Sequence, residues 1–168
     1  IRAEQMTRQE RDYWQNSGKF TVIYGRFDIF ILFMEQALKL LNEGGRFGYI
    51  VPSALLSQNY AKLLRKKLID ESHITTIIDL SEYKVFQNAS VATTIITIQK
   101  RGSQKPNEQN LIKVIKQQNY SKGIDPNEDE QFYLDQSVFD TTKNYMFRLE
   151  LTDENLNLVQ KIKQSSLT

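Results

Sequence analysis

Few side chains in this 168-residue sequence are of the types that form covalent intermediates or hold a metal. Histidine occurs once, as His73, and cysteine is absent, which argues against zinc sites and Cys–His catalysis. His73 stands between an acidic stretch and a predicted strand, a position typical of a surface or capping residue. Ser53 and Ser57 have no obvious base to activate a hydroxyl. One acidic group is expected to be a solvated loop rather than a metal site: Asp125, Glu128, Asp129 and Glu130.

Motifs that cradle phosphates are missing as well. The sequence contains neither G-x-G-x-x-G nor G-K-[ST]. The formal net charge is only +2, so the composition does not indicate a nucleic-acid-binding protein. Hydrophobic residues make up 40% and charged residues 25% of the chain, which is ordinary for one soluble globular domain. Composition and isolated residues therefore indicate a globular domain without a catalytic group of its own.

Targeting and membrane segments are not expected. The chain begins IRAEQMTRQERDYW, with charges from the second residue onward and no apolar core of a signal peptide. The longest apolar run, Ile29 to Met34, is far shorter than the roughly 18 residues of a membrane span. We therefore expect a cytoplasmic protein with no membrane partner. Because the first residue is not Met, the sequence suggests a fragment or a processed chain.

The stretch from Gly25 to Leu56, GRFDIFILFMEQALKLLNEGGRFGYIVPSALL, delivers a long helix almost directly into a strand. Apolar residues at a spacing of about 3.6 predict a helix over 28–42 that is buried on most sides. Gly44 and Gly45 stand where a helix ends in the left-handed conformation. RFGYIVP then predicts a strand that Pro52 terminates, because proline cannot donate to a strand ladder.

The remaining sequence predicts further helices and strands. Ser57 is expected to cap a helix over 58–70, and a short helix is expected near 7–15. β-branched residues predict strands over 73–80 and 91–100, which are close enough in sequence to pair antiparallel. Helices that alternate with such strands indicate an α/β sheet covered on both faces. The other expected elements are a strand at 111–117, strand-like pieces within 132–149 and a helix at 152–164.

Together these segments resemble the second half of the catalytic domain of N6-adenine-specific DNA methyltransferases, as found in type IIG restriction–modification enzymes and related adenine methylases. The resemblance is carried by FDIF, by LNEGGRFGYIVP, by the basic helix that follows, and by IIDLSEYKVFQNASVATTIITIQK. It implies a partial class I S-adenosylmethionine-dependent methyltransferase (Rossmann-like) sheet. Strands 5 to 7 of that sheet would be 46–51, 74–80 and 91–99, the last antiparallel to its neighbours. Residues 1–100 would complete the catalytic domain, and residues 101–168 would form a connector towards a target-recognition domain.

The resemblance also assigns roles to individual residues. Phe86 matches the aromatic residue that stacks on a flipped-out adenine, with a hydrophobic plug as the alternative. Pro52 and Ser53 would border the base pocket, because ligands of open α/β sheets bind beyond the carboxyl ends of strands; alternatively, Pro52 only ends its strand. Phe33 matches an aromatic residue that borders the cofactor's adenine, with the helix core as the alternative. Basic residues of the next helix are candidates for DNA phosphate contacts, or else form a solvated face: Lys62, Arg65, Lys66 and Lys67.

The family's catalytic motif, Asn/Asp-Pro-Pro-Tyr/Phe, and its glycine-rich cofactor loop do not occur in this sequence. The resemblance places the motif just upstream of Ile1, so no residue of this chain is expected to be catalytic and the chain alone is expected to be inactive. The full-length enzyme would transfer a methyl group from S-adenosylmethionine to adenine N6 within a restriction–modification system. Its partners would be double-stranded DNA and the missing N-terminal half of the catalytic domain. This chain alone is expected to bind no cofactor and no metal.

Two other functions remain open at this stage. One keeps the fold and changes the substrate, as in a methyltransferase-like domain that acts on RNA or protein. The other is a non-catalytic interaction domain. The sequence upstream of Ile1 distinguishes them, since an Asn-Pro-Pro-Tyr motif there favours an amino group as the methyl acceptor.

Overall fold

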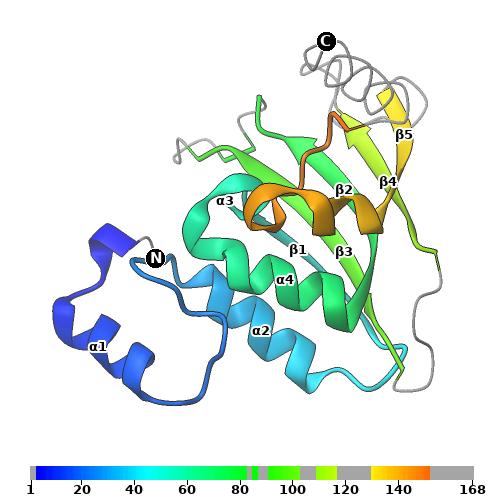
Figure 1. The fold of residues 1–168 in the computed structure, drawn as a ribbon. Coiled ribbons are helices and arrows are strands. Elements are labelled where there is room, and N and C mark those ends of the chain that lie inside the picture. Colours follow the sequence, from blue (N-terminus) through cyan, green and yellow to red (C-terminus); the bar gives the residue numbers. More distant parts are fainter. Residues whose placement is uncertain (1–2, 83–84, 87–90, 103–108, 117–129, 152–168) are drawn as a thin grey trace, which may run out of the picture.

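The computed structural model describes residues 3–82, 85–86, 91–102, 109–116 and 130–151. These residues form two layers, a five-stranded sheet and a set of helices packed on it (Figure 1). Asp125, Glu128 and Asp129 and the predicted helix at 152–164 lie outside the described residues, whereas Glu130 begins a strand. The helices are α1 Arg8–Asn16, α2 Phe30–Leu40, α3 Ala54–Ser57 and α4 Lys62–Glu71, with 3-10 turns η1 Ala3–Gln5, η2 Asn59–Ala61, η3 Gln136–Thr141 and η4 Lys143–Tyr145. The strands are β1 Arg46–Pro52, β2 Ser72–Leu80, β3 Thr93–Lys100, β4 Leu111–Lys116 and β5 Glu130–Asp135.

The strand order of the sheet is β1-β3-β2-β4-β5, and β3 runs antiparallel to both of its neighbours, as the sequence predicted. Pro52 is in register with Thr93, and Thr93 with Leu80. The carboxyl ends of β1 and β2 and the beginning of β3 therefore share one edge of the sheet, which we call the carboxyl rim. β2 is parallel to β4, and β4 is antiparallel to β5, so β1 and β5 are the edge strands of the described sheet.

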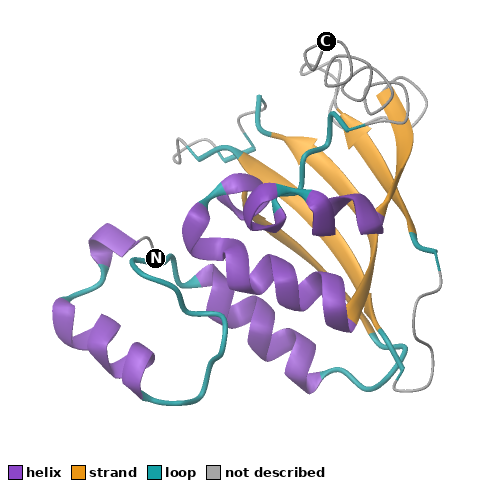
Figure 2. Cartoon of the chain, viewed as in Figure 1, coloured by secondary structure: helices purple, strands orange, loops and turns teal. Residues whose placement is uncertain are grey.

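The core lies between the sheet and the helices. Strand residues such as Ile77 and Ile96 are in register and fully buried, and Leu64 and Leu68 of α4 belong to the same cluster. Helices α2, α3 and α4 lie on one face of the sheet, and α1 lies to the side, away from the strands (Figure 2). The prediction that helices cover both faces is therefore wrong for the described part of the chain. Registered isoleucines cross four strands on the other face: Ile50, Ile95, Ile78 and Ile115.

Helix α2 ends earlier than the glycine pair suggested. Its last residue is Leu40, and Leu41 is already extended, with ψ of 138°. Gly44 adopts φ of +75° in a turn that the amide of Gly45 closes on the carbonyl of Asn42 at 2.9 Å. Gly44 therefore supplies the left-handed residue of the turn into β1 rather than of the helix end. No helix in the described ranges is long and apolar enough to cross a bilayer.

The predicted cap at Ser57 is wrong. Ser57 is the last residue of α3, and the chain extends at Gln58, with ψ of 141°, before it enters η2 and α4. The residue that precedes α4 is Ala61, whose side chain cannot cap a helix. In contrast, α1 begins with a capping box in which Thr7 and Glu10 bond each other's backbone amides.

The segment after β5 is helical rather than strand-like. Residues 136–151, which we call the strap, contain η3 and η4 and lie across α4 (Figure 1). Phe139 and Phe147 are buried and stack with their ring centroids 4.7 Å apart, and Leu149 is buried as well. The strap is therefore part of the core. The assignment of residues 101–168 as a connector stays a prediction.

Candidate functional site

The carboxyl rim gathers three of the predicted site residues. Pro52 ends β1, and the amide of Ser53 donates to the carbonyl of Ala92 at 2.9 Å, which fixes the end of β1 beside the beginning of β3. Phe86 lies in the connection between β2 and β3, which leaves and re-enters the sheet at this same rim. Its side chain is 46% exposed. A ring with that exposure is not buried in the core, which argues against the alternative of a hydrophobic plug. Stacking on a base stays the prediction for Phe86.

Phe33 projects from the outer side of α2 and is 61% exposed, so it is not a residue of the helix core. It borders an apolar pocket of about 120 Å³. The other lining residues are Trp14, Phe20, Ile29, Leu32 and Gln36. Apolar walls of this kind suit part of an aromatic ring system, since stacking and burial need little directional bonding.

A buried carboxylate fixes the loop that brings Phe20 to this pocket. Glu35 on α2 is fully buried and accepts hydrogen bonds from the Thr21 amide at 2.9 Å and the Val22 amide at 3.2 Å. The Lys39 ammonium lies 3.0 Å away. Burial acts to raise the pKa of Glu35, but the hydrogen bonds from Lys39, Thr21 and Val22 outweigh it, so the pKa is lowered from its ordinary value. The sequence analysis missed this role, although a charged residue inside an apolar stripe was a signal for it.

The beginning of α2 is tied to the loop that follows the rim. Tyr60 donates its hydroxyl to Asp28 at 2.8 Å, and its ring meets that of Phe30 edge-on at 6.2 Å. Burial and the hydrogen bond to Asp28 raise the pKa of the Tyr60 hydroxyl, so it stays protonated and keeps donating at neutral pH. The helix that carries Phe33 is therefore anchored beside the rim that carries Pro52 and Ser53.

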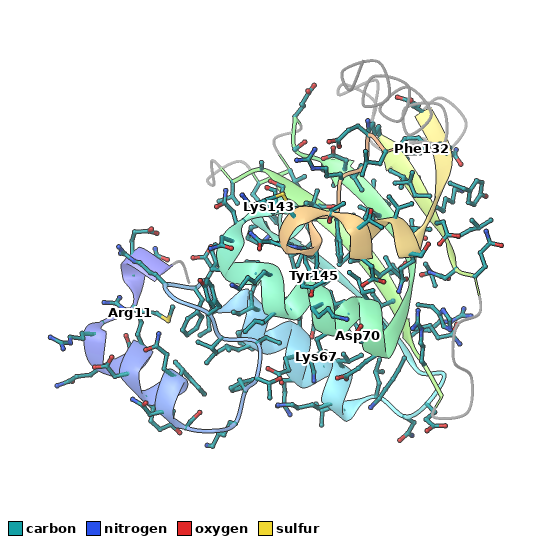
Figure 3. The ribbon with its side chains drawn as sticks, viewed as in Figure 1. Arg11, Lys67, Asp70, Phe132, Lys143 and Tyr145 are labelled. Carbon is teal, nitrogen blue, oxygen red and sulfur yellow. The ribbon has the colours of Figure 1, made fainter. Side chains whose placement is uncertain are left out.

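The lysines of α4 are held in different ways. Lys62 places its ammonium 3.4 Å from the centroid of the Tyr24 ring. Lys66 pairs with Asp70 and lies over the ring of Tyr145, whose side chain Figure 3 shows against α4. Lys67 pairs with Glu71 at 2.7 Å. Such contacts at a partly exposed helix face are worth little each and leave the ammonium groups able to meet an anion.

The predicted phosphate contact of Arg65 is wrong, because its side chain is fully buried. Its guanidinium donates to four backbone carbonyls: Leu55, Gln58, Asn144 and Tyr145. Burial lowers the pKa of the guanidinium to about 10, so the group is still charged at neutral pH. Its donors are directed into the protein, where they join α3, α4 and the strap. The pattern of Leu64 and Leu68 around it did not reveal this burial.

A larger pocket, of about 530 Å³, lies elsewhere. Arg101 follows the end of β3, and Asp70 is near the end of α4. Because Pro52 pairs with the beginning of β3, this pocket lies at the end of the strands opposite the carboxyl rim. It also contains Asp135 and Asp140, whose charge is unsuited to phosphate. Across the described ranges, no group of three or more acidic or histidine side chains is arranged to hold a metal.

Comparison with known proteins identifies similar sequences. The model of the Eco57I restriction-modification methylase family matches residues 1–86. The chain is 31% identical over 96 residues to the type II restriction enzyme and methyltransferase RM.Eco57I of Escherichia coli, covering 57% of this chain and 9% of that protein. It is 30% identical over 106 residues to the type II methyltransferase M.BstVI of Geobacillus stearothermophilus, covering 63% of this chain and 16% of that protein.

The fold is also found in a larger solved protein. The type IIG restriction endonuclease BpuSI superposes on 92% of this chain with a TM-score of 0.59 and 16% identity, and the match covers 19% of BpuSI. At that identity the likeness concerns the fold alone. The chain thus spans less than a fifth of each of these three proteins.

Proposed function

Because this chain belongs to the Eco57I restriction-modification methylase family, we propose that it is the C-terminal part of the catalytic domain of a cytoplasmic DNA methyltransferase. The full-length enzyme transfers the methyl group of S-adenosylmethionine to adenine N6 in double-stranded DNA, within a restriction–modification system. The observation that carries the proposal is the exposed Phe86 ring on the loop that shares a rim with Pro52 and Ser53.

The rim supplies a place for an extruded base. An enzyme that acts on a base inside a duplex must flip it out of the stack, and a protein ring can replace part of the lost stacking. The half-exposed ring of Phe86 offers such a surface, worth about 1–3 kcal/mol per base. Pro52 and Ser53 lie at the same rim, at the end of β1, and we place the extruded base between them and Phe86.

The pocket beside Phe33 fits one part of S-adenosylmethionine. Its apolar walls suit the edge of an adenine ring, which they would hold by burial and stacking. At about 120 Å³ it holds only a portion of the cofactor. The rest of the cofactor is bound by the N-terminal half of the domain, and the cofactor supplies the activated methyl group. Glu35 keeps the wall of this pocket in place by holding the loop at Thr21.

The N-terminal half of the domain pairs with the free edge of β1. In the described sheet β1 has one neighbour, and its Tyr49 and Ile50 are 37% and 43% exposed. Unpaired edge groups and exposed apolar side chains favour addition of another strand. The catalytic motif enters with that half, and its Asn/Asp side chain and proline carbonyl accept hydrogen bonds from the adenine amino group. No residue of this chain acts as a base.

Two partly exposed lysines of α4 are placed to face the DNA backbone. Lys62 and Lys66 are one helical turn apart and partly exposed, so both can approach phosphates. Arg65, which lies between them in sequence, takes no part because it is buried.

The direct test uses the full-length protein. It is incubated with duplex DNA and methyl-labelled S-adenosylmethionine, and the digested nucleosides are identified by mass spectrometry. We expect N6-methyladenine, and no further label on DNA that the same enzyme has already modified. Label on cytosine, on RNA or on protein would contradict the proposed substrate, and no transfer to any of them would favour the interaction domain.

A further inference from the structure

Arg65 lies where the strap contacts the loop that follows the carboxyl rim. The rim loop, Ser53–Asn59, follows the end of β1 and contains α3. The strap is more than 75 residues further along the sequence and comes from the opposite end of the chain. Arg65 on α4 lies between them and is fully buried.

Arg65 divides its hydrogen bonds between the two segments. Nη1 donates to the carbonyls of Leu55 and Gln58 in the rim loop, each at 2.9 Å. Nη2 donates to the carbonyl of Asn144 at 2.8 Å, and Nε to that of Tyr145 at 2.9 Å. Charged donors to neutral carbonyls make stronger hydrogen bonds than neutral pairs. One guanidinium therefore bonds both segments at once.

Other contacts reinforce the same junction. The amide of Phe147 donates to the carbonyl of Leu56 at 2.8 Å, and the Asn144 side chain donates to Asn59 at 3.1 Å. Besides the contacts of Arg65, two hydrogen bonds therefore join the rim loop directly to the strap. Phe147 is buried, whereas Asn59 is exposed, so the second tie can be removed without opening the core.

The strap is bent sharply where Arg65 holds it. Asn144 and Tyr145 both have φ of +57°, a conformation that residues other than glycine adopt at a cost. These are the two residues whose carbonyls face Arg65. A costly conformation persists only where surrounding contacts determine it. Arg65 is the charged member of those contacts.

The geometry points to Arg65 as a positioning residue that fixes the rim loop to the strap, so that the base pocket beside Pro52 and Ser53 keeps its shape while the C-terminal part of the enzyme engages DNA. This inference rests on the proposed function, since it concerns how that site is held. Arg65 touches neither base nor cofactor, and it acts through the backbone of the rim loop. Lysine cannot replace it, because one ammonium on a flexible stem cannot serve carbonyls on both sides.

The test compares three variants of the full-length enzyme. Arg65→Lys keeps the positive charge but loses the planar guanidinium group. Asn59→Ala removes the exposed hydrogen bond between Asn59 and Asn144. Arg148→Lys makes the same chemical change as Arg65→Lys, but at an exposed position of the strap. Capture of the base is followed with 2-aminopurine at the target position. The methylation rate is measured in a single turnover, and cofactor affinity is measured by calorimetry.

We expect Arg65→Lys to lower the single-turnover rate and the 2-aminopurine signal about tenfold, and Asn59→Ala about threefold, as for loss of one or two hydrogen bonds. Cofactor affinity should stay within about twofold in both, which a general loss of folding would not allow. Arg148→Lys should behave like the wild type.

A folded Arg65→Lys enzyme with wild-type rate and wild-type fluorescence would overturn the inference. If Arg65→Lys does not fold, Asn59→Ala decides, and a wild-type rate in that variant overturns it as well. A wild-type enzyme that neither flips a base nor methylates DNA would instead show that the proposed function itself is wrong.

Discussion

Arg65 donates to the carbonyl of Asn144 at 2.8 Å, and Asn144 has φ of +57°. The two residues are 79 positions apart in the sequence, so the left-handed turn of the strap depends on a helix that is formed by a distant part of the chain. The side chain at position 144 decides how much that turn costs, because asparagine tolerates the left-handed region better than most residues and β-branched residues tolerate it least.

Asn144→Val should therefore destabilise the chain by about 1–2 kcal/mol, from backbone strain. Asn144→Gly should cost about 1 kcal/mol less than Asn144→Val, because glycine adopts positive φ freely and both variants lose the same hydrogen bond to Asn59. Urea unfolding of both variants checks the difference. The exposed neighbour Lys143 is the matched control, since η4 holds positive φ at 144 and 145 but not at 143, and Lys143→Val should cost little. Equal losses in Asn144→Val and Asn144→Gly would argue against strain.

Glu35→Gln should cost about 2 kcal/mol at neutral pH. The amide group keeps the shape of the side chain but has one acceptor oxygen instead of two. If that oxygen keeps the Thr21 and Val22 amides, the NH2 group faces the Lys39 ammonium, and the ion pair is lost. The matched control is Glu71→Gln, which removes an exposed partner of Lys67 and should cost less than about 1 kcal/mol. Thermal and urea unfolding give both values.

The same carboxylate sets an acid limit on stability. Because the pKa of Glu35 is lowered in the folded chain, its stabilising contribution is complete above the ordinary pKa of 4.5 and is lost as the pH falls from there through the folded value. In the wild type the free energy of unfolding should fall over that window, and Glu35→Gln should remove part of the slope. An unchanged slope in the variant would assign the acid sensitivity to other groups.

Phe86→Ala should leave the melting temperature of this chain nearly unchanged, because the ring is already 46% exposed. In the full-length enzyme it should weaken capture of the flipped base by about 1–3 kcal/mol, and Phe86→Trp should preserve much of the capture. Phe139→Ala is the contrasting control, since Phe139 is fully buried and its truncation should cost about 3–5 kcal/mol. Unfolding caused by Phe86→Ala, or wild-type flipping in that variant, would disprove the stacking role.

The isolated chain should bind S-adenosylmethionine weakly or not at all. The pocket beside Phe33 has room for only part of the cofactor, and the sequence contains no G-x-G-x-x-G motif that could hold the rest. Isothermal titration calorimetry of the purified chain measures this directly. Micromolar affinity would show that the described residues contain a more complete cofactor site than Phe33 and its neighbours provide.

Phe33→Ala in the full-length enzyme should raise the dissociation constant of S-adenosylmethionine roughly tenfold, as expected when burial of a ring is lost. Stability should change little, because Phe33 is 61% exposed in this chain. Leu40→Ala, two turns further along α2 at a side chain that is 74% exposed, is the control and should leave the cofactor affinity unchanged. A loss of affinity in both variants would indicate a disturbed helix face rather than a ring contact.

The sequence predicted most of the sheet because its strands carry local signals. β-branched residues identified β2 and β3, and Pro52 fixed the end of β1. The antiparallel placement of β3 followed from the family resemblance and is confirmed by the register. Helix ends were predicted less well, because Gln58 and Leu41 leave the helical conformation without glycine or proline to mark the change.

Arg65 and Glu35 were harder to recognise from the sequence than the residues to which the resemblance assigns a site role, and that assignment stays a prediction. A family pattern that can be recognised in the sequence alone identified these residues: Phe33, Pro52, Ser53 and Phe86. Arg65 looked like one more basic residue of a helix surface, because its partners are backbone carbonyls that no sequence pattern records. The rim loop supplies two of these carbonyls and the strap the other two, and the strap is held in place by the packing of Phe139 and Phe147.

The edge of β1 that has no neighbour among the described strands has a consequence for handling the isolated protein. A strand with open hydrogen-bonding groups and exposed Tyr49 and Ile50 can pair with a second copy of itself as readily as with its intended neighbour. Arg46 and Pro52 at its two ends oppose such aggregation through charge and through the missing amide, but the five residues between them carry no charge. Concentrated solutions of the chain should therefore self-associate edge to edge, and co-expression with the N-terminal half should suppress that association by occupying the strand first.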